Sequence, residues 1–441
     1  MYAVEVFARF ATGFAQAPLP AVVAHHAQRA VIDWYASIYP GLDTPAVQVL
    51  NRTMAEDLDR GASQLVQGRK ATARAAALIQ GTAAHAAEVD DSFRDAMYHP
   101  GAATIAAALA MAQTVGASGP EFLRAVVAGY EVSTRIGVVM GRPHYKYWHN
   151  TGTMGSFGAA AAAASLLKLD EAAFANALAI AATFTAGLQQ AFRLEAMAKP
   201  LHAGRAAEAG VLAAQLAAGG MRSSLDVLEG ESGLGQAMSQ GPDWSAVGAT
   251  LGTDFHITRL TFKSHIGCGH TFAAIDGALE LQRQHGFSHA DIERVTLGVY
   301  QPTLDIAPHV DPQNADQARF SLHYMVATAL VHGSVRLSAF EPVRLNDPAT
   351  RSLMQRIHKA LDPEVDAAFP GRRGARVAIT LRDGRTLALL QPDRKGDPEL
   401  PLSDADLEGK LMELATPLIG EIPARSLLDR IWQLHQSTNL P

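Results

Sequence analysis

Apolar side chains recur every three or four positions through most of the chain up to about residue 255, which is the spacing of a helix that buries one face. The pattern is plainest in three segments, residues 20–39, 69–89 and 121–140. Acidic residues stand where helices would begin, at Glu121 after Pro120 and at Glu171 after Asp170. The first part of the chain is therefore predicted to be helical, and it shows no fixed repeat period that would suggest a solenoid.

The pattern changes after residue 255. Residues 294–302 alternate apolar and polar side chains, as a half-buried strand does. Residues 376–391 hold two such runs, joined at Asp383-Gly384, the dipeptide that a type I′ hairpin turn prefers. Helical segments lie between these strands. Together they predict a smaller α/β or α+β unit over roughly residues 258–396.

The last stretch of the chain is helical again from about Ser403, a residue type that caps helix N-termini. A helical tail that follows a mixed insert can rejoin the first domain, and we favour this arrangement over three separate domains. The predicted fold is thus mainly α. It has a large all-helical domain built from both chain ends, residues 1–257 and 397–441, and a smaller α+β domain over residues 258–396.

The composition fits a large buried core and excludes some partners. Of the 441 residues, 48% are apolar and 18% are charged, and the net charge is −6, so general electrostatic attachment to nucleic acid or to a membrane is not expected. Any bound anion must be held by a local group of cations. The longest uncharged run, 151–167, consists of Gly, Ala and Ser more than Leu or Ile, which favours an interior helix over a membrane span. A single cysteine, Cys268, and no basic leader favour a cytoplasmic protein.

Four stretches place ionisable side chains in apolar or glycine-rich surroundings. Their candidate residues are Glu88, Asp90, Asp91, Ser92 and His99 in residues 85–103, His149 in residues 144–160, Lys199 and His202 in residues 195–210, and Lys263, His265, Cys268 and His270 in residues 262–277. Lys199 and Lys263 are the most informative, because lysine is scarce in this chain and neither stands on an obviously solvated face. A buried ammonium needs a partner, which can be a substrate carboxylate or an Asp or Glu of the chain.

The other candidates have structural explanations that stay open. Asp-Asp-Ser before an apolar run is often only a helix cap, and a lone His202 can be an ordinary core residue. Gly152, Gly155 and Gly158 form a GxxGxxG pattern with no strand before it. Close helix packing therefore explains these glycines better than a dinucleotide-binding loop does.

Metal and cofactor sites are not expected. His265, Cys268 and His270 have the donor types of a zinc site, but three donors within six residues are awkward to wrap around one tetrahedral ion. The sequence also contains no P-loop, no GxSxG elbow and no lipoyl, haem or iron–sulfur signature. We therefore expect no bound metal and no cofactor.

At the same stretches the sequence resembles the MmgE/PrpD family, whose members include 2-methylcitrate dehydratase, cis-aconitate decarboxylase and iminodisuccinate epimerase. The resemblance rests on HAAEVDDS…HPGAA, WHNTGTMGSFGAAAAAASLLKLD, KPLHAGRAAEAGVLAAQLAAGG, K-x4-C followed by AAID, and RFSLHYMVATALVHG, in family order between about residues 80 and 333. It implies a large helical domain, a smaller α+β lid that excludes water from the site, and a homodimer.

Carried over by position, the resemblance implies a set of site residues with distinct roles. The catalytic residues would be Glu88, His99, His149, Lys199 and Tyr324, and the substrate-binding residues would be Ser92, His202, Lys263 and Cys268. Asp91 and His270, from the same stretches, are further substrate-binding candidates. Lys199, His99 and His149 would neutralise substrate carboxylates. A neutral histidine or Glu88 would take or return a proton, and Tyr324 would donate a proton or orient a leaving hydroxyl.

The sequence departs from the family pattern at three places. Glu88 stands where the family often has Asp, and Cys268 stands where decarboxylase members have His. The loop from Ser92 to His99 is also one residue longer than in the decarboxylase. These departures argue against cis-aconitate as the substrate and leave dehydratase or epimerase chemistry open.

We therefore expect a cofactor-independent lyase of the dehydratase type, acting on a small di- or tricarboxylic acid through a carboxylate-stabilised carbanion. The alternatives are an epimerase of a substituted succinate such as iminodisuccinate, a decarboxylase of a cis-aconitate-like acid, and a non-catalytic carboxylate-binding protein. Ala-rich segments at 158–167 and 210–220 let helices approach closely. We expect such faces to gain further burial in a homodimer, unless the single chain already covers them.

Overall fold

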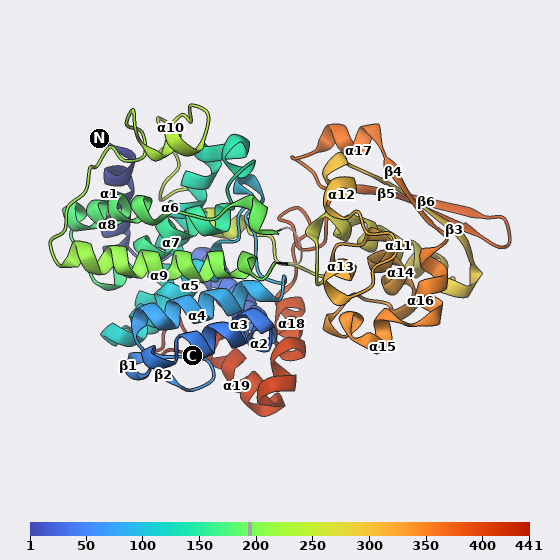
Figure 1. The fold of residues 1–441 in the computed structure, drawn as a ribbon, viewed down its shortest axis with the longest axis horizontal. Coiled ribbons are helices and arrows are strands. Elements are labelled where there is room, and N and C mark those ends of the chain that lie inside the picture. The colour runs from blue at the N-terminus through green and yellow to red at the C-terminus, as the bar shows by residue number, and fades with distance from the viewer. Residues whose placement is uncertain (193–195) are drawn as a thin grey trace. The chain divides into compact units, whose positions relative to one another are not determined.

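The computed structural model describes residues 1–192 and 196–441, and the chain divides into two compact units. Unit 1 comprises Met1–Thr261 and Ser403–Pro441, and unit 2 comprises Phe262–Leu402. Figure 1 follows the chain through both units, with the C-terminal helices in red beside the blue N-terminal helices of unit 1. The prediction of a mainly α fold with a smaller α+β part is confirmed.

Unit 1 is built almost wholly of helices. Its helices are α1 (Ala3–Gln16), α2 (Ala21–Leu42), α3 (Pro45–Thr53), α4 (Ala73–Ala86), α5 (Pro100–Val115), α6 (Gly119–Tyr145), α7 (Asn150–Leu166), α8 (Glu171–Phe184), α9 (Ala198–Ala218), α10 (Leu234–Met238), α18 (Asp404–Ile419) and α19 (Glu421–Trp432). The predicted acidic starts are confirmed, since Asp170 caps α8 and Ser118 forms a capping box with Glu121 at the start of α6.

Helix α7 forms the centre of unit 1, where it packs against α5, α6 and α9. Its side chains are almost all buried. A Cβ added to Gly158 would lie 2.5 Å from Thr104 Oγ1 of α5, and one added to Gly155 would lie 2.9 Å from Ala103 Cβ. The glycine pattern therefore serves close helix packing, as the sequence predicts. None of the described helices, α7 included, is long and apolar enough to cross a membrane.

A short β-pair in unit 1 is the feature that the helical pattern did not predict. Strand β1 (Leu58–Gln64) pairs antiparallel with β2 (Lys70–Ala71). The helix expected over residues 69–89 therefore begins only at Ala73, where the Thr72 hydroxyl accepts a hydrogen bond from Ala75 N. The cap and the strand pairing outweigh the helical periodicity of the preceding residues.

Unit 2 combines a small sheet with short helices. Its elements are α11 (Phe272–His285), β3 (Ile292–Val299), α12 (Gln301–Ile306), α13 (Ala315–Arg319), α14 (Leu322–His332), α15 (Pro342–Leu345), α16 (Pro348–Met354), β4 (Ile357–Leu361), α17 (Pro363–Ala368), β5 (Ala375–Leu381) and β6 (Thr386–Gln391). The strand order is β4-β3-β5-β6, and only the β3–β4 pair in this sheet is parallel. The predicted hairpin is confirmed, but its turn is not type I′, because Gly384 has a φ of 87° while the φ of Asp383 is not positive.

Candidate active site

A cluster of imidazole, ammonium and carboxylate groups lies in unit 1 where several segments converge. His85 comes from the last turn of α4, and Glu88 and Asp90 follow it in the loop that leads to His99, the residue before α5. His149 precedes the first turn of α7, and Lys199 and His202 lie in the first turns of α9. Helix ends thus deliver most of these side chains, which fixes their backbones on rigid elements.

Asp90 links two of the histidines. Its Oδ2 lies 2.7 Å from Nδ1 of His85 and 3.4 Å from Nδ1 of His99. The Nδ1 of His99 also lies 2.7 Å from the backbone oxygen of Asp91. Because a carbonyl oxygen can only accept, this nitrogen must carry the hydrogen, and in neutral His99 the Nε2 keeps its lone pair.

His149 and His202 form a second pair, with their Nδ1 atoms 3.0 Å apart. One of these nitrogens must donate and the other accept, so both rings cannot carry a hydrogen there. Burial lowers the pKa of His149 well below its usual value, and the nearby charges of His85 and Lys199 lower it further. The pKa of His202 is lowered for the same reasons, burial first. His149 is therefore neutral at pH 7 in the ligand-free chain.

Lys199 forms an ion pair with Glu88. Burial alone would lower the pKa of Lys199, but the Glu88 carboxylate outweighs it and raises that pKa. The ion-pair alternative for this lysine is thus what the structure shows, and the partner is itself a predicted site residue. Glu88 adopts a φ of 60°, a backbone conformation that side chains rarely take, so the surrounding contacts hold it in place.

Asp91 and Ser92 lie in the same loop but are engaged by the fold. The Asp91 carboxylate accepts hydrogen bonds from Tyr130 Oη at 2.7 Å and from Gly101 N at 3.0 Å. Burial, and next the charge of Asp33, raises the pKa of Asp91 to about 8. Ser92 pairs through its backbone with Thr261. These contacts favour a structural role for the Asp91 side chain, whose substrate-binding role stays a prediction.

The remaining predicted residues lie in unit 2. Lys263 and Cys268 are buried there. His265 Nε2 lies 2.8 Å from Asp276 Oδ1, and His270 Nδ1 lies 2.8 Å from Tyr300 Oη. Burial lowers the pKa of His270 well below its usual value.

Tyr324 is fully buried in unit 2 and donates a hydrogen bond to the Ala339 carbonyl. Its hydroxyl is thus engaged by the fold. The catalytic and binding roles of the unit 2 residues remain predictions.

One group of donors could hold a metal ion. His85, Asp90 and His99 each offer a ligand atom, and these atoms lie within 4.8 Å of one another. Hydrogen bonding accounts for the same geometry, because the 2.7 Å contact between His85 and Asp90 is a normal charge-assisted bond. Among the described residues, no such group includes His265, Cys268 and His270.

Sequence reasoning gave no role to His85, although its ring is fully buried at the centre of the cluster. Its centroid lies 4.9 Å from that of His99 and 5.5 Å from that of His149. Its Nε2 has no hydrogen-bond partner among the described residues. The signal lies in HAAEVD, where a histidine at a helix end precedes an aspartate by five residues, but an alanine-rich helix offers no reason to single it out.

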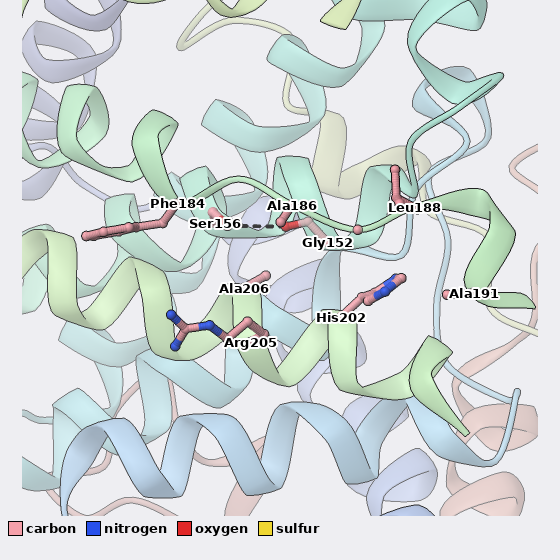
Figure 2. Close-up of a pocket in the computed structure, with 10 residues that line it drawn as sticks. Gly152, Ser156, Phe184, Ala186, Leu188, Ala191, His202, Arg205 and Ala206 are labelled. Carbon is pink, nitrogen blue, oxygen red and sulfur yellow. Dashed lines mark hydrogen bonds between the residues drawn. The ribbon is translucent and has the colours of Figure 1, made fainter. Parts of the chain in front are cut away.

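A pocket of about 310 Å³ adjoins this cluster through His202. It lies between α9 and the segment that follows α8, and its lining includes Phe184, Ala186, Leu188 and Arg205. Figure 2 shows His202 and Arg205 on the same helix, below the strand-like segment that carries Ala186 and Leu188. His149 N donates to the Gly187 carbonyl of that segment at 2.8 Å, so the pocket wall and the histidine pair are directly joined.

The chain matches one protein family along most of its length. The MmgE/PrpD N-terminal domain matches residues 5–247, and the MmgE/PrpD C-terminal domain matches residues 265–436. Cis-aconitate decarboxylase-like protein oryM of Aspergillus oryzae is 27% identical over 449 residues, covering 96% of this chain and 92% of that protein. The cis-aconitate decarboxylases of Mus musculus and Homo sapiens are each 27% identical, over 81% and 80% of this chain and 75% of their own lengths.

Proposed function

Because the chain belongs to the MmgE/PrpD family, we propose that it is a lyase that acts on a small di- or tricarboxylic acid without a cofactor. The observation that carries the proposal is the buried cluster of unit 1, where one ammonium and several imidazoles gather around two carboxylates. A chain with a net charge of −6 needs a local site to hold a polyanion, and Lys199 with the titratable imidazoles around it is suited to that task.

The difficult step is the formation of a carbanion next to a carboxylate. Lys199 is positioned to exchange its Glu88 partner for a substrate carboxylate, which offsets the additional negative charge as the bond breaks. His149 and His202 lie in the same cluster. A bound anion beside them would raise their pKa values and favour their protonated forms.

His99 is the base that the hydrogen bonds favour. Its Nδ1 donates its hydrogen to the Asp91 carbonyl, so Nε2 is the nitrogen through which a neutral His99 would take a substrate proton. The side chain keeps 20% of its surface exposed, unlike His85, so a ligand can reach it. Glu88, once released by Lys199, is the second group that can accept a proton.

Loss of water is the reaction that we propose first. His99 takes a proton from a carbon next to a carboxylate, and the electron pair of that C–H bond forms a C=C bond. The hydroxyl on the neighbouring carbon takes a proton from the His99 imidazolium so formed and leaves as water. The departures at Glu88 and Cys268 support a substrate other than cis-aconitate.

Decarboxylation is the second candidate, because relatives that match most of this chain are named cis-aconitate decarboxylases. Here a C–C bond breaks, carbon dioxide leaves, and the remaining electron pair takes a proton. The same cations would stabilise both carbanions.

Proton NMR in deuterium oxide tests the proposal with a panel of hydroxylated and unsaturated polycarboxylic acids. A new vinyl signal with loss of the hydroxy acid supports dehydration, and conversion of an unsaturated acid to a product with one carboxylate fewer supports decarboxylation. Deuterium exchange without net product would support an epimerase. No exchange with any member of the panel would contradict a lyase and favour a binding protein.

Replacement of Lys199 by Met tests the site itself. Loss of a charge-assisted contact in the transition state commonly costs about 2 to 4 kcal/mol, so we expect kcat/KM to fall by about 30- to 1,000-fold. Lys168→Met is the matched control, because Lys168 is exposed and pairs with Glu121 on the surface. An unchanged kcat/KM in the Lys199 variant would assign Lys199 to a structural ion pair.

A further inference from the structure

The C-terminal part of the chain reaches the loop of the candidate active site through one buried lysine. Lys410 lies on α18, is 4% exposed, and places its Nζ 2.6 Å from Asp33 Oδ1 of α2. The same ammonium donates a hydrogen bond of 2.6 Å to the backbone oxygen of Val89. A residue near the end of the chain thus contacts the loop that carries Glu88 and Asp90.

Val89 occupies a critical position in that loop. It stands between Glu88, the partner of Lys199, and Asp90, the partner of His85 and His99. Its carbonyl lies in the peptide plane shared with Asp90, so anchoring it restrains the backbone at Asp90 directly and at Glu88 through Val89. Since Glu88 holds a φ of 60°, this stretch depends on outside contacts to keep its conformation.

A lysine at position 410 would stabilise the packing of α18 on α2 little more than an apolar side chain would. Burying an ion pair gains little over packed apolar side chains, because the desolvation of both ions offsets their attraction. α18 already docks on α2 through a second ion pair, Arg29 with Asp404, nearer the surface. What Lys410 adds is a donor for the Val89 carbonyl, which an apolar residue would leave buried without a partner.

We propose that Lys410 is a positioning residue of the candidate active site, which holds Glu88 and Asp90 in place through the Val89 carbonyl. The role rests on the proposed function. Lys410 does not touch substrate in this scheme. It acts through the loop, so its loss should disturb the Lys199–Glu88 pair and the His85–Asp90–His99 bonds together.

Two variants separate this role from simple stability. Lys410→Met removes the charge and the donor and deprives buried Asp33 of the ammonium that pairs with it, so it can destabilise the chain. The double variant Asp33→Asn with Lys410→Met removes both charges and still lacks the donor to Val89. Arg29→Met is the matched control, since it breaks the neighbouring ion pair between the same two helices.

The measurements are kcat, KM and the pH profile of turnover, together with the imidazole NMR titration of His85 and His99 in histidine-labelled protein without substrate. We expect the double variant to lose at least tenfold in kcat with a smaller change in KM, and to shift the pH profile and both titrations. Arg29→Met should leave all of these as in the unsubstituted chain.

A folded double variant with unchanged imidazole titrations and unchanged kcat would overturn the positioning role. The same follows if Arg29→Met changes kcat and the titrations as much as the double variant does. The two proposals fail separately. If the unsubstituted chain turns over no polycarboxylate, the proposed function is wrong, and the imidazole titrations alone then decide whether Lys410 sets the geometry of the loop.

Discussion

At the scale of single residues, the neutral state of His149 controls how the candidate site meets a polyanion. Burial and the charges of His85 and Lys199 hold the pKa of His149 well below its usual value, and His202 is shifted in the same direction. Carboxylates of a bound ligand act in the opposite direction and raise both pKa values. At a pH between the pKa of such a histidine in the free chain and its higher pKa in the complex, the complex carries more protons than the free chain.

Binding of a saturated tricarboxylic acid such as tricarballylate should therefore take up protons and tighten as the pH falls. The affinity of a site that gains one proton rises about tenfold per pH unit within the window between the two pKa values. Calorimetry in buffers of different ionisation enthalpy measures the uptake directly. His149→Asn should reduce it, whereas pH-independent binding without uptake would show that the imidazoles do not respond to the ligand.

The site was only partly predictable at this scale. Motif positions identified His99, His149 and Lys199, and the structure of unit 1 brings all three into one cluster. Their spacing along the chain could not reveal His85 or the role of Asp90, because these side chains are connected by a hydrogen bond that only the folded loop creates. Lys410 was equally hidden, since it lies 321 residues from Val89.

At the scale of elements, periodicity and turn chemistry predicted most of the long helices and the hairpin. The uncharged run of Gly, Ala and Ser predicted α7 as an interior helix, and the Asp-Gly dipeptide predicted the position of the hairpin turn but not its type. The β1–β2 pair was missed because it is short and its burial does not alternate regularly. The register in which β1 pairs with β2 is not specified by the pattern of apolar and polar residues.

Gly158 provides a test of the close packing of α7. A Cβ at this position would lie 2.5 Å from Thr104 Oγ1 and 2.9 Å from Ser133 Oγ, so Gly158→Ala forces two neighbouring helices to shift. We expect the free energy of unfolding to fall by about 1 to 3 kcal/mol. Urea denaturation measures it.

Gly13→Ala is the matched control, because Gly13 also lies in a helix but has nothing within 4 Å of an added Cβ. It should leave stability unchanged or raise it by up to about 1 kcal/mol, which is the helix-propensity difference between Gly and Ala. Equal destabilisation by both substitutions would show that α7 does not need its glycine for packing.

At the scale of the whole molecule, one argument for a homodimer no longer holds. The alanines of α7 are buried within this chain, and most of those of α9 are buried as well. The small-residue faces are thus used inside a single copy, and the expectation of a dimer rests on the family resemblance. Light scattering at micromolar concentration tests it, with a mass near twice 46.8 kDa expected and 46.8 kDa contradicting it.

The construction of unit 1 from both chain ends makes its folding depend on the last helices. α18 packs against α2, where Lys410 neutralises the buried Asp33, and Gln28 donates a hydrogen bond of 2.6 Å to the Trp432 carbonyl. A chain that ends at Leu402 would leave Asp33 buried without its cation, which commonly costs about 3 to 5 kcal/mol, and would expose the apolar face of α2. These losses are comparable to the whole stability of a typical domain.

We therefore expect the chain truncated at Leu402 to lose the cooperative thermal transition of unit 1 and to become sensitive to protease throughout residues 1–261. A chain that ends at Thr438 is the control, because it keeps α18, α19 and the bond from Gly119 N to the Ser437 carbonyl. Adding residues 403–441 as a separate peptide should restore the transition, since the docking contacts are noncovalent. If the chain truncated at Leu402 melts cooperatively at an unchanged temperature, the N-terminal helices fold stably by themselves, and α18 and α19 do not contribute to the stability of unit 1.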